Sequence, residues 1–218
     1  MKRFLPSWSG GKDSGYALML AKSTGFQPVA LLNILNEQSQ LSRSHGIPKE
    51  IIEKQAALLG LPIYCPSASW ETYEDVFISG LKKLKEQVGF DSAVFGDIDL
   101  QAHRDWEEKV CQEAKVKPLL PLWQQNRKAI VEEMLLAGME AYIVSCNETM
   151  GPSFLGRQIT LELVQELEIL GVDPCGENGE YHTLVVNMPL FSARLDVIFG
   201  TAKQHNAYWF VDMRLAYP

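Results

Sequence analysis

The hexapeptide Ser9-Gly10-Gly11-Lys12-Asp13-Ser14 decides how the start of this chain folds. It follows an apolar run at 4–8 and precedes a helical pattern at 16–22. A glycine pair between a strand and a helix lets the backbone approach an anion closely, and the helix N-terminus adds unpaired N–H groups and a partial positive charge. Lys12 contributes a full charge, and the serine hydroxyls can donate hydrogen bonds. The stretch therefore predicts a polyphosphate site, and the alternative is an ordinary glycine-rich turn capped by Asp13 or Ser14.

The spacing of this loop excludes one large class of nucleotide-binding proteins. A Walker loop needs a glycine, four residues, and then Gly-Lys-Ser/Thr. Here Asp13 follows Lys12, and no glycine stands at Ser7 or nearby to complete the pattern. The hexapeptide instead resembles the PP-loop of the ATP pyrophosphatases, which cut ATP between its α- and β-phosphates.

Composition and charge narrow the classes of partner. The chain has 218 residues, with 20 basic and 27 acidic side chains and a net charge of -7. A large nucleic-acid surface usually carries excess Lys and Arg, so a nucleic-acid partner is not expected. No apolar run approaches the ~18 residues of a membrane span. The N-terminus runs straight into the first strand without a signal peptide, so we expect a cytoplasmic protein with no membrane partner.

The four cysteines, Cys65, Cys111, Cys146 and Cys175, are far apart in the sequence, and no CxxC occurs. This spacing favours reduced, buried thiols over a disulfide framework or a zinc ribbon. It also speaks against an iron–sulfur tRNA thiolase.

Strands and helices alternate through the first half of the chain. Strands are predicted at 4–8, 27–33, 61–64 and 92–96, and 116–121 leads to a fifth strand that ends at 122–123. Helices are predicted at 48–59, 73–87 and 105–114. This rhythm predicts an α/β fold with a parallel sheet covered on both faces, whose ligands bind at the carboxyl ends of the strands. Helices at 127–137 and 160–170 and strands at 141–146, 184–188 and 208–215 follow, with a boundary expected near 121–126.

Four segments together resemble one family, the diphthine–ammonia ligases among the ATP pyrophosphatases, including their bacterial relatives. The segments are 9–14; 45–48 with 55–62; 96–98 with 104–107 and 121–123; and 176–183, which reads Gly-Glu-Asn-Gly-Glu-Tyr-His-Thr. The resemblance extends from Phe4 to about Met188. The first segment is shared by many PP-loop enzymes, and the last is the discriminating one.

The resemblance implies a fold and an activity. Residues 1–122 are expected to form an adenine nucleotide alpha-hydrolase-like (HUP, Rossmann-like) domain with a five-stranded parallel sheet and flanking helices, and 123–218 a smaller α+β substrate domain. The implied enzyme is an AMP-forming carboxylate–ammonia ligase that uses ATP and Mg²⁺, passes through an acyl-adenylate, and takes ammonia as nitrogen donor. The acceptor carboxylate would lie on elongation factor 2 if the host makes diphthamide.

The same resemblance suggests roles for the phosphate loop and for Asp97. Lys12 and the N–H groups of Gly10, Gly11 and Ser14 are expected at the β- and γ-phosphates, with hydrogen bonds from the hydroxyls of Ser9 and Ser14. Asp13 would position Mg²⁺ or the loop itself. Asp97 would contact a second metal or the ribose, or else cap the helix that follows it.

Substrate-binding residues are expected in three other places. His45 lies in a polar loop and is a candidate contact to substrate or nucleotide, and Arg104 is either a substrate contact or a surface helix residue. In the last segment, Glu177, Glu180, Tyr181, His182 and Thr183 could bind a metal, ammonium or a cationic substrate such as the quaternary ammonium of diphthine. Glu177 or Glu180 could remove a proton from attacking ammonia, which would make them catalytic with Lys12 and Asp13. The alternative is a polar β-turn.

Other functions stay open at this point. A PP-loop enzyme that adenylates another small molecule or a tRNA base is one, and a non-catalytic adenine-nucleotide-binding module is another. The apolar strand at 208–211 is a candidate contact in a homo-oligomer.

Overall fold

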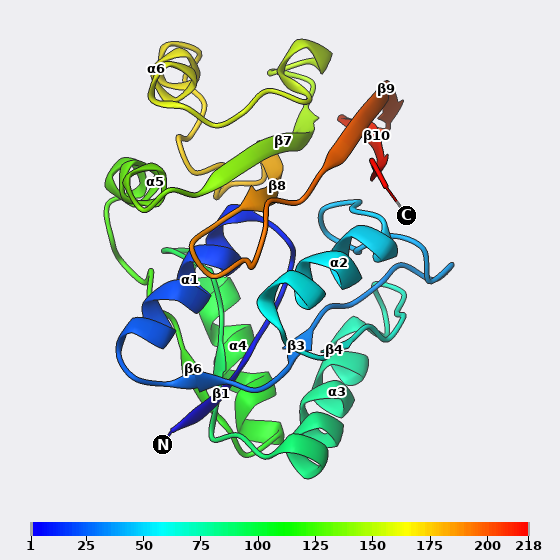
Figure 1. Ribbon diagram of the computed structural model, residues 1–218, viewed down its shortest axis with the longest axis vertical. Coiled ribbons are helices and arrows are strands. Elements are labelled where there is room, and N and C mark those ends of the chain that lie inside the picture. The colour runs from blue at the N-terminus through cyan, green and yellow to red at the C-terminus, as the bar shows by residue number, and fades with distance from the viewer. Residues whose placement is uncertain (1, 218) are drawn as a thin grey trace.

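The computed structural model describes residues 2–217, which form two lobes, each built on its own sheet (Figure 1). The lobe drawn at the bottom contains the N-terminal half of the chain, and its strands are parallel. These strands are β1 (Arg3–Pro6), β2 (Gln27–Pro28), β3 (Leu31–Leu32), β4 (Ile63–Tyr64), β5 (Ser92–Val94) and β6 (Lys117–Leu119). The residue at which one lobe gives way to the other, expected between 122 and 123, stays a prediction.

The parallel sheet follows the predicted plan with one difference. Four strands are hydrogen-bonded in the order β2-β1-β5-β6, and β3 pairs with β4. A parallel bridge between Ser7 and Leu32, where Trp8 N donates to Leu32 O at 2.8 Å, connects the two groups of strands. β2 and β3 are halves of the predicted second strand: Val29 N still bonds Phe4 O, whereas Leu31 N bonds Pro62 O. The α/β class is confirmed, and the strand count differs because this strand is divided.

Helices cover both faces of this sheet because neighbouring strand residues point to opposite sides. Phe4 packs in the apolar cluster of the first pair of helices, and Leu5 packs in the cluster of the second pair. The first pair is α1 (Lys12–Ser23) and α2 (Lys49–Leu59), and the second is α3 (Tyr73–Val88) and α4 (Gln101–Glu113). Helix α2 ends as predicted at Gly60, whose φ of 67° is left-handed.

The C-terminal lobe is an antiparallel sheet in the order β8-β7-β10-β9 with short helices. Its elements are α5 (Arg127–Leu136), β7 (Glu140–Asn147), η1 (Pro152–Phe154), α6 (Leu161–Ile169), β8 (Tyr181–Asn187), β9 (Val197–His205) and β10 (Tyr208–Leu215). Asn126 caps α5 by accepting from Ala129 N, and Thr160 caps α6 by accepting from Leu163 N. Strand β9 was not predicted. It pairs with β10 and exposes most of its side chains.

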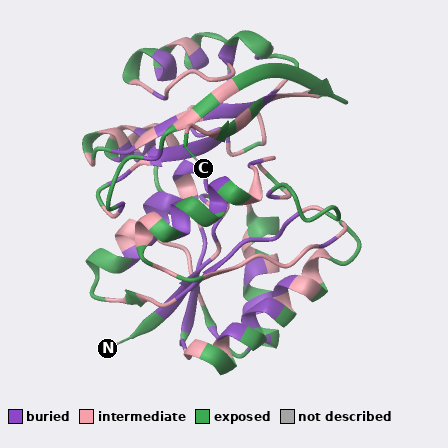
Figure 2. Cartoon of the chain, turned by 45° about the vertical axis from the view of Figure 1, so that its right-hand side comes forward, coloured by how far each residue is buried: buried purple, intermediate pink, exposed green. Residues whose placement is uncertain are grey.

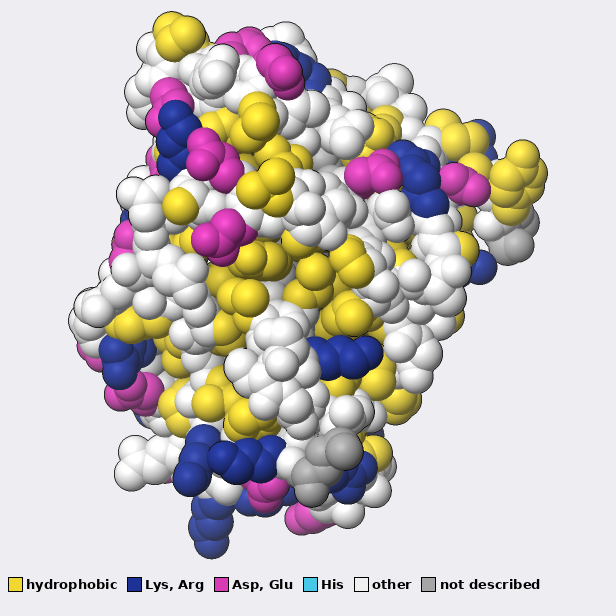
Figure 3. Space-filling view, turned by 60° about the vertical axis from the view of Figure 1, so that its left-hand side comes forward, with side chains coloured by type: hydrophobic (Ala, Val, Ile, Leu, Met, Phe, Trp, Pro, Cys, Tyr) yellow, Lys and Arg dark blue, Asp and Glu magenta, His cyan; other side chains and the backbone are white. Residues whose placement is uncertain are grey.

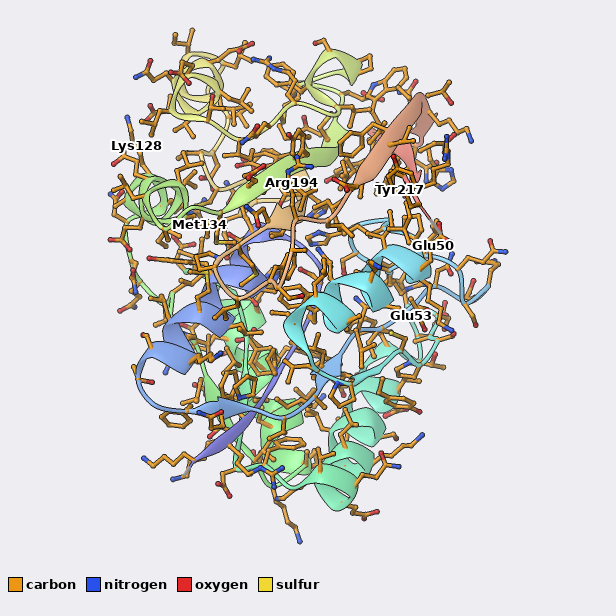
Figure 4. All side chains as sticks on the ribbon, in the orientation of Figure 1. Glu50, Glu53, Lys128, Met134, Arg194 and Tyr217 are labelled. Carbon is orange, nitrogen blue, oxygen red and sulfur yellow. The ribbon has the colours of Figure 1, made fainter. Side chains whose placement is uncertain are left out.

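One apolar core crosses from lobe to lobe. Ala17 of α1 and Val185 of β8 belong to the same buried cluster, and buried residues follow the strands of both sheets in Figure 2. On α5, Figure 4 shows Lys128 and Met134 on opposite sides of the helix: Met134 is buried, and Lys128 pairs with Glu168 of α6. The two lobes therefore pack against each other across a shared apolar core.

One face of the molecule carries a broad band of hydrophobic side chains, with charged side chains mainly above and below it (Figure 3). Such bands are frequent at contact surfaces. The oligomeric state stays a prediction. Within residues 2–217, none of the helices is both long and apolar enough to cross a bilayer.

Candidate active site

A cavity of about 710 Å³ opens between the lobes at the carboxyl ends of β1 and β5. Its walls are the phosphate loop (the residues of the 9–14 hexapeptide), the Gly96–Asp97 turn with the first half of α4, and the segment 176–183. This is the edge at which ligands bind in open parallel sheets. The place predicted from the strand–loop–helix order is therefore hollow and lined by polar groups.

The phosphate loop has the close packing that its glycines suggest. Gly10 has a φ of 86°, and a Cβ there would lie 2.7 Å from Ile52 Cδ1. A Cβ on Gly11 would lie 2.5 Å from His45 Cε1. The hydroxyls of Ser9 and Ser14 are 3.0 Å apart and link the two ends of the loop.

Lys12 is a buried cation at the start of α1. Its Nζ donates to the Asp13 carboxylate at 2.9 and 3.1 Å and to the Cys175 carbonyl, and it lies 5.2 Å from the centre of the Tyr181 ring. Burial alone would lower the pKa of Lys12, but the charges of Asp13, Tyr181 and Cys175 and the hydrogen bond to Asp13 together raise that pKa. Lys12 is therefore protonated beside the helix N-terminus.

Strand β8 of the C-terminal lobe is hydrogen-bonded to the phosphate loop. The Thr183 hydroxyl accepts from Lys12 N at 3.0 Å, and Val185 N donates to Gly10 O at 2.9 Å. Gln55, fully buried in α2, donates from Nε2 to both Gly10 O and Val185 O at 3.0 and 2.7 Å. The loop is thus fixed by contacts from both lobes. Gln55 lies in one of the segments that suggested the family, but it was not predicted as a site residue.

The rings of His45 and His182 lie beside the loop with their centres 4.6 Å apart and their planes tilted by 31°. His45 Nδ1 lies 3.0 Å from the Thr183 carbonyl, which can only accept, so this nitrogen carries the proton. Burial lowers the pKa of His45 to about 4 and that of His182 well below its ordinary value. Both rings are neutral at pH 7 and line the cavity.

Acidic side chains gather at the α4 end of the cavity. Glu177 accepts from Ile98 N at 2.9 Å, and His103 Nδ1 donates to Asp97 at 2.7 Å. Burial raises the pKa of Glu177 to about 7, with further effects from Asp13 and Asp97. Burial also raises the pKa of Glu107 to about 11, reinforced by its hydrogen bond with Asp97.

An ion-pair network fixes the turn that carries Glu177. Arg127 pairs with Asp99 of the N-terminal lobe, through Nε at 2.8 Å, and with Asp173. Asp173 also accepts from Cys175 N at 2.9 Å and from Glu177 N at 3.2 Å. Neither Arg127 nor Asp173 was predicted as a site residue.

Most of the predicted site residues lie together around the cavity. Ser9, Lys12, Asp13, Ser14, His45, Asp97, Glu177, Tyr181, His182 and Thr183 line it. Tyr181 does so from a buried position, with its hydroxyl donating to Pro174 O. The roles assigned to these residues stay predictions.

Four predicted residues are not among those that line the cavity: Gly10 and Gly11 of the phosphate loop, and Arg104 and Glu180. Arg104 donates to Glu108 at 2.8 Å, with its guanidinium 5.0 Å from the Trp123 ring centre. Glu180 accepts from Asn178 N and Nδ2, both at 3.1 Å, and so braces the turn next to Glu177. His103 and Glu107, which were not predicted, do line the cavity.

Comparison with known proteins matches both halves of the chain to the same family. The family model described as the diphthamide synthase N-terminal domain matches residues 2–118, and the model of its C-terminal domain matches 126–216. Proteins named diphthine–ammonia ligase are 28% identical in mouse, 29% in rat and 28% in human, each match covering 91% of this chain and 84% of the relative. A solved structure described as a predicted tRNA methyltransferase subunit from Methanocaldococcus jannaschii has a TM-score of 0.46 at 17% identity over 87% of this chain and 98% of that one, a likeness too weak to carry an argument.

Proposed function

Because the chain belongs to the diphthamide synthase family, we propose that it is an ATP-dependent ligase that forms an amide from a carboxylate and ammonia. The support comes from relatives named for that activity along most of the chain and from the cavity built on the phosphate loop. The observation that carries the proposal is Lys12, a buried, protonated amine at a helix N-terminus, facing a cavity large enough for a nucleotide.

We propose that the triphosphate binds at the start of α1. Gly10, Gly11 and Ser14 would donate backbone N–H groups, Ser9 and Ser14 their hydroxyls, and Lys12 its charge. A phosphate oxygen would replace the Asp13 carboxylate or the Cys175 carbonyl as a partner of Lys12 Nζ.

The proposed chemistry has two steps. A carboxylate oxygen of the acceptor attacks the α-phosphorus of ATP, and the bond to the bridging oxygen breaks, which gives an acyl-adenylate and pyrophosphate. The nitrogen of ammonia then attacks the acyl carbon, the bond to the AMP oxygen breaks, and the amide nitrogen loses a proton. Lys12 would stabilise the charge that develops on the leaving pyrophosphate.

Asp13 is the residue that we propose for Mg²⁺. It is a cavity-lining carboxylate next to the phosphate loop, which is the ligand type that Mg²⁺ combines with phosphate oxygens. Mg²⁺, when bound, would supply charge neutralisation on the phosphates. Asp97, predicted as a second metal or ribose ligand, forms with His103 and Glu177 a group whose possible ligand atoms lie within 4.8 Å of one another, and its role stays a prediction.

Glu177 is the residue that we propose as general base for the second step. Its pKa of about 7 lets it accept a proton near neutral pH. It lines the cavity, and the charges of Asp13, Asp97 and Lys12 are close enough to affect its pKa. His45 and His182 would contact the substrate or the nucleotide as neutral hydrogen-bonding groups. The acceptor would be a carboxylate on a protein, elongation factor 2 where the host makes diphthamide.

The experiment that tests this function measures AMP and pyrophosphate released from ATP with Mg²⁺, ammonium and candidate carboxylates. We expect AMP from the wild type and none from Lys12→Ala, with the circular dichroism of the variant unchanged. Lys128→Ala, which removes an exposed lysine on α5, is the matched control and should retain full activity. Release of ADP in place of AMP, or an active Lys12→Ala, would overturn the proposal.

A further inference from the structure

Arg127 connects the two lobes through one carboxylate in each. It is the first residue of α5, and two of its nitrogens donate to Asp99 of the N-terminal lobe, Nε at 2.8 Å. A third nitrogen donates to Asp173, in the loop before β8 of the C-terminal lobe. Arg127 is not among the residues that line the cavity, so it can affect the reaction only through the residues that it holds.

The first connection from Arg127 to Glu177 runs through the backbone. Asp173 Oδ2 accepts from Arg127 Nη1 and also from Glu177 N, the latter at 3.2 Å. The Asp173 side chain is 5% exposed, and a carboxylate this deeply buried needs donors around it. The thiol of Cys175 also donates to the Arg127 carbonyl at 2.9 Å. The loop 173–177 is therefore attached to the start of α5 at two points.

The second connection runs through the carboxylate of Glu177. Its Oε1 accepts from Ile98 N at 2.9 Å, and Ile98 directly precedes Asp99 in the chain. Gln124, in the segment that leads to α5, donates from its backbone N to the Ile98 carbonyl at 2.7 Å. The donor to the Glu177 carboxylate is thus held by the linker on one side and by the neighbouring Asp99–Arg127 pair on the other.

The place of Arg127 in α5 gives no local reason for a cation. At the first position of a helix the macrodipole already presents partial positive charge and disfavours another. Within residues 2–217, both ion-pair partners of Arg127 lie outside α5. Residues that break a local rule in this way are expected at functional or strained sites. The two carboxylates that Arg127 joins therefore explain its charge better than the helix does.

We propose that Arg127 is the residue that positions Glu177 for catalysis, by joining Asp99 of the N-terminal lobe to Asp173 of the C-terminal lobe. This inference rests on the proposed function for the role of Glu177 as general base. Because the two partners belong to different lobes, Glu177 is held in place only while the lobes are joined.

The test measures hydrogen exchange of single amides by nuclear magnetic resonance. In Arg127→Gln we expect the amides of Ile98 and Glu177 to lose about tenfold or more of their protection, the effect of weakening a hydrogen bond that involves a charged group. Protection is read relative to Val185 N, which donates to Gly10 O and reports the contact between the lobes. Unchanged protection overturns the proposal, and so does an equal loss at all three amides, because that is the effect of lower overall stability.

The full reaction supplies a second measurement. We expect Arg127→Gln to lower kcat about tenfold or more while the KM for ATP stays within about twofold, because the base moves and the phosphate loop does not. Arg127→Lys keeps a charge between the two carboxylates and should recover part of the lost kcat. Arg157→Gln, which removes an ion pair with Glu166 in the same lobe, is the matched control and should behave as the wild type does. Equal kcat in Arg127→Gln and Arg127→Lys overturns the positioning role, as does a loss of ATP affinity as large as the loss of kcat.

The two measurements separate this inference from the proposed function. Hydrogen exchange needs no acceptor, so a wild type that forms no AMP refutes the proposed function, and the exchange result still decides whether Arg127 holds Glu177 in place. If Arg127→Gln does not fold, Asp99→Asn replaces it. The Asp99 side chain is 36% exposed, so this variant removes only the partner in the N-terminal lobe, and we expect the same loss of protection at Ile98 and Glu177.

Discussion

Gly96 offers the sharpest test of how the phosphate loop is built. It follows β5 and packs against the first turn of α1, and a Cβ at this position would lie 2.7 Å from both Asp13 C and Ser14 N. These are backbone atoms of the helix that we propose to bind phosphate, so the crowding in Gly96→Ala cannot be relieved by turning a flexible side chain.

The size of the effect follows from this distance. Ordinary contacts of a Cβ begin at 3.4 Å, so the start of α1 must move by about 0.7 Å relative to Gly96. Overpacking of this kind costs about 1–3 kcal/mol of the free energy of unfolding. For a chain of this size each kcal/mol lowers Tm by about 2–4 °C, so we expect Gly96→Ala to melt about 2–12 °C lower. A displacement approaching ~1 Å also lowers kcat/KM by up to about 100-fold.

The assay compares Gly96→Ala with a substitution at a glycine within α1 itself. Gly15 stands in α1, and the nearest atom to its added Cβ is Met139 Cε at 3.1 Å, the end of a flexible side chain. We expect Gly15→Ala to leave ATP affinity unchanged and to change stability by less than about 1 kcal/mol. Thermal melting and calorimetric titration with ATP measure both variants. If Gly96→Ala melts and binds ATP as the wild type does, the loop is not fixed by Gly96 and the reasoning fails.

Two other predictions concern the segment that carries Glu177. Because burial raises the pKa of Glu177 to about 7, its base form is lost below that pH. The measured quantity is the wild-type rate divided by the rate of Glu177→Gln, because this ratio cancels the ionisation of free ammonia. As the pH increases toward 7 the ratio should increase about tenfold per pH unit, and above pH 7 it should stay constant. A ratio that does not vary with pH would exclude Glu177 as the base. Glu180→Gln should keep its ATP affinity but form product more slowly, because Glu180 braces Asn178 beside Glu177. An equal loss of ATP affinity, measured by titration, would place Glu180 at the nucleotide.

The fold was predictable where the sequence carries local signals. Gly60 and Gly138 end α2 and α5 with left-handed φ values of 67° and 81°, and the predicted helices stop at these glycines. Strand β9 carries no such signal. Its segment 200–205 is exposed on both faces, so no apolar alternation marks it, and only its pairing with β10 defines it as a strand.

The site was predictable only in part, because only some of its residues lie close together in the sequence. The phosphate loop is contiguous, and its residues show their chemistry together. Gln55 and Arg127 act through partners far along the chain, which spacing does not reveal. Glu107 did leave a signal: it falls within the apolar helical stripe that includes Val110 and Cys111, where a carboxylate is out of place.

The two lobes are coupled through the donors that a nucleotide would use. Lys12 N already donates to Thr183 Oγ1, and Lys12 Nζ to the Cys175 carbonyl, so β8 and the loop before it occupy part of the anion site. A phosphate oxygen carries more charge than either neutral acceptor and makes the stronger hydrogen bond, so the exchange favours the nucleotide. Thr183 and Cys175 then lose partners in the N-terminal lobe. Since the same stretch of chain carries Glu177, we expect bound nucleotide to change the position of Glu177 in the cavity.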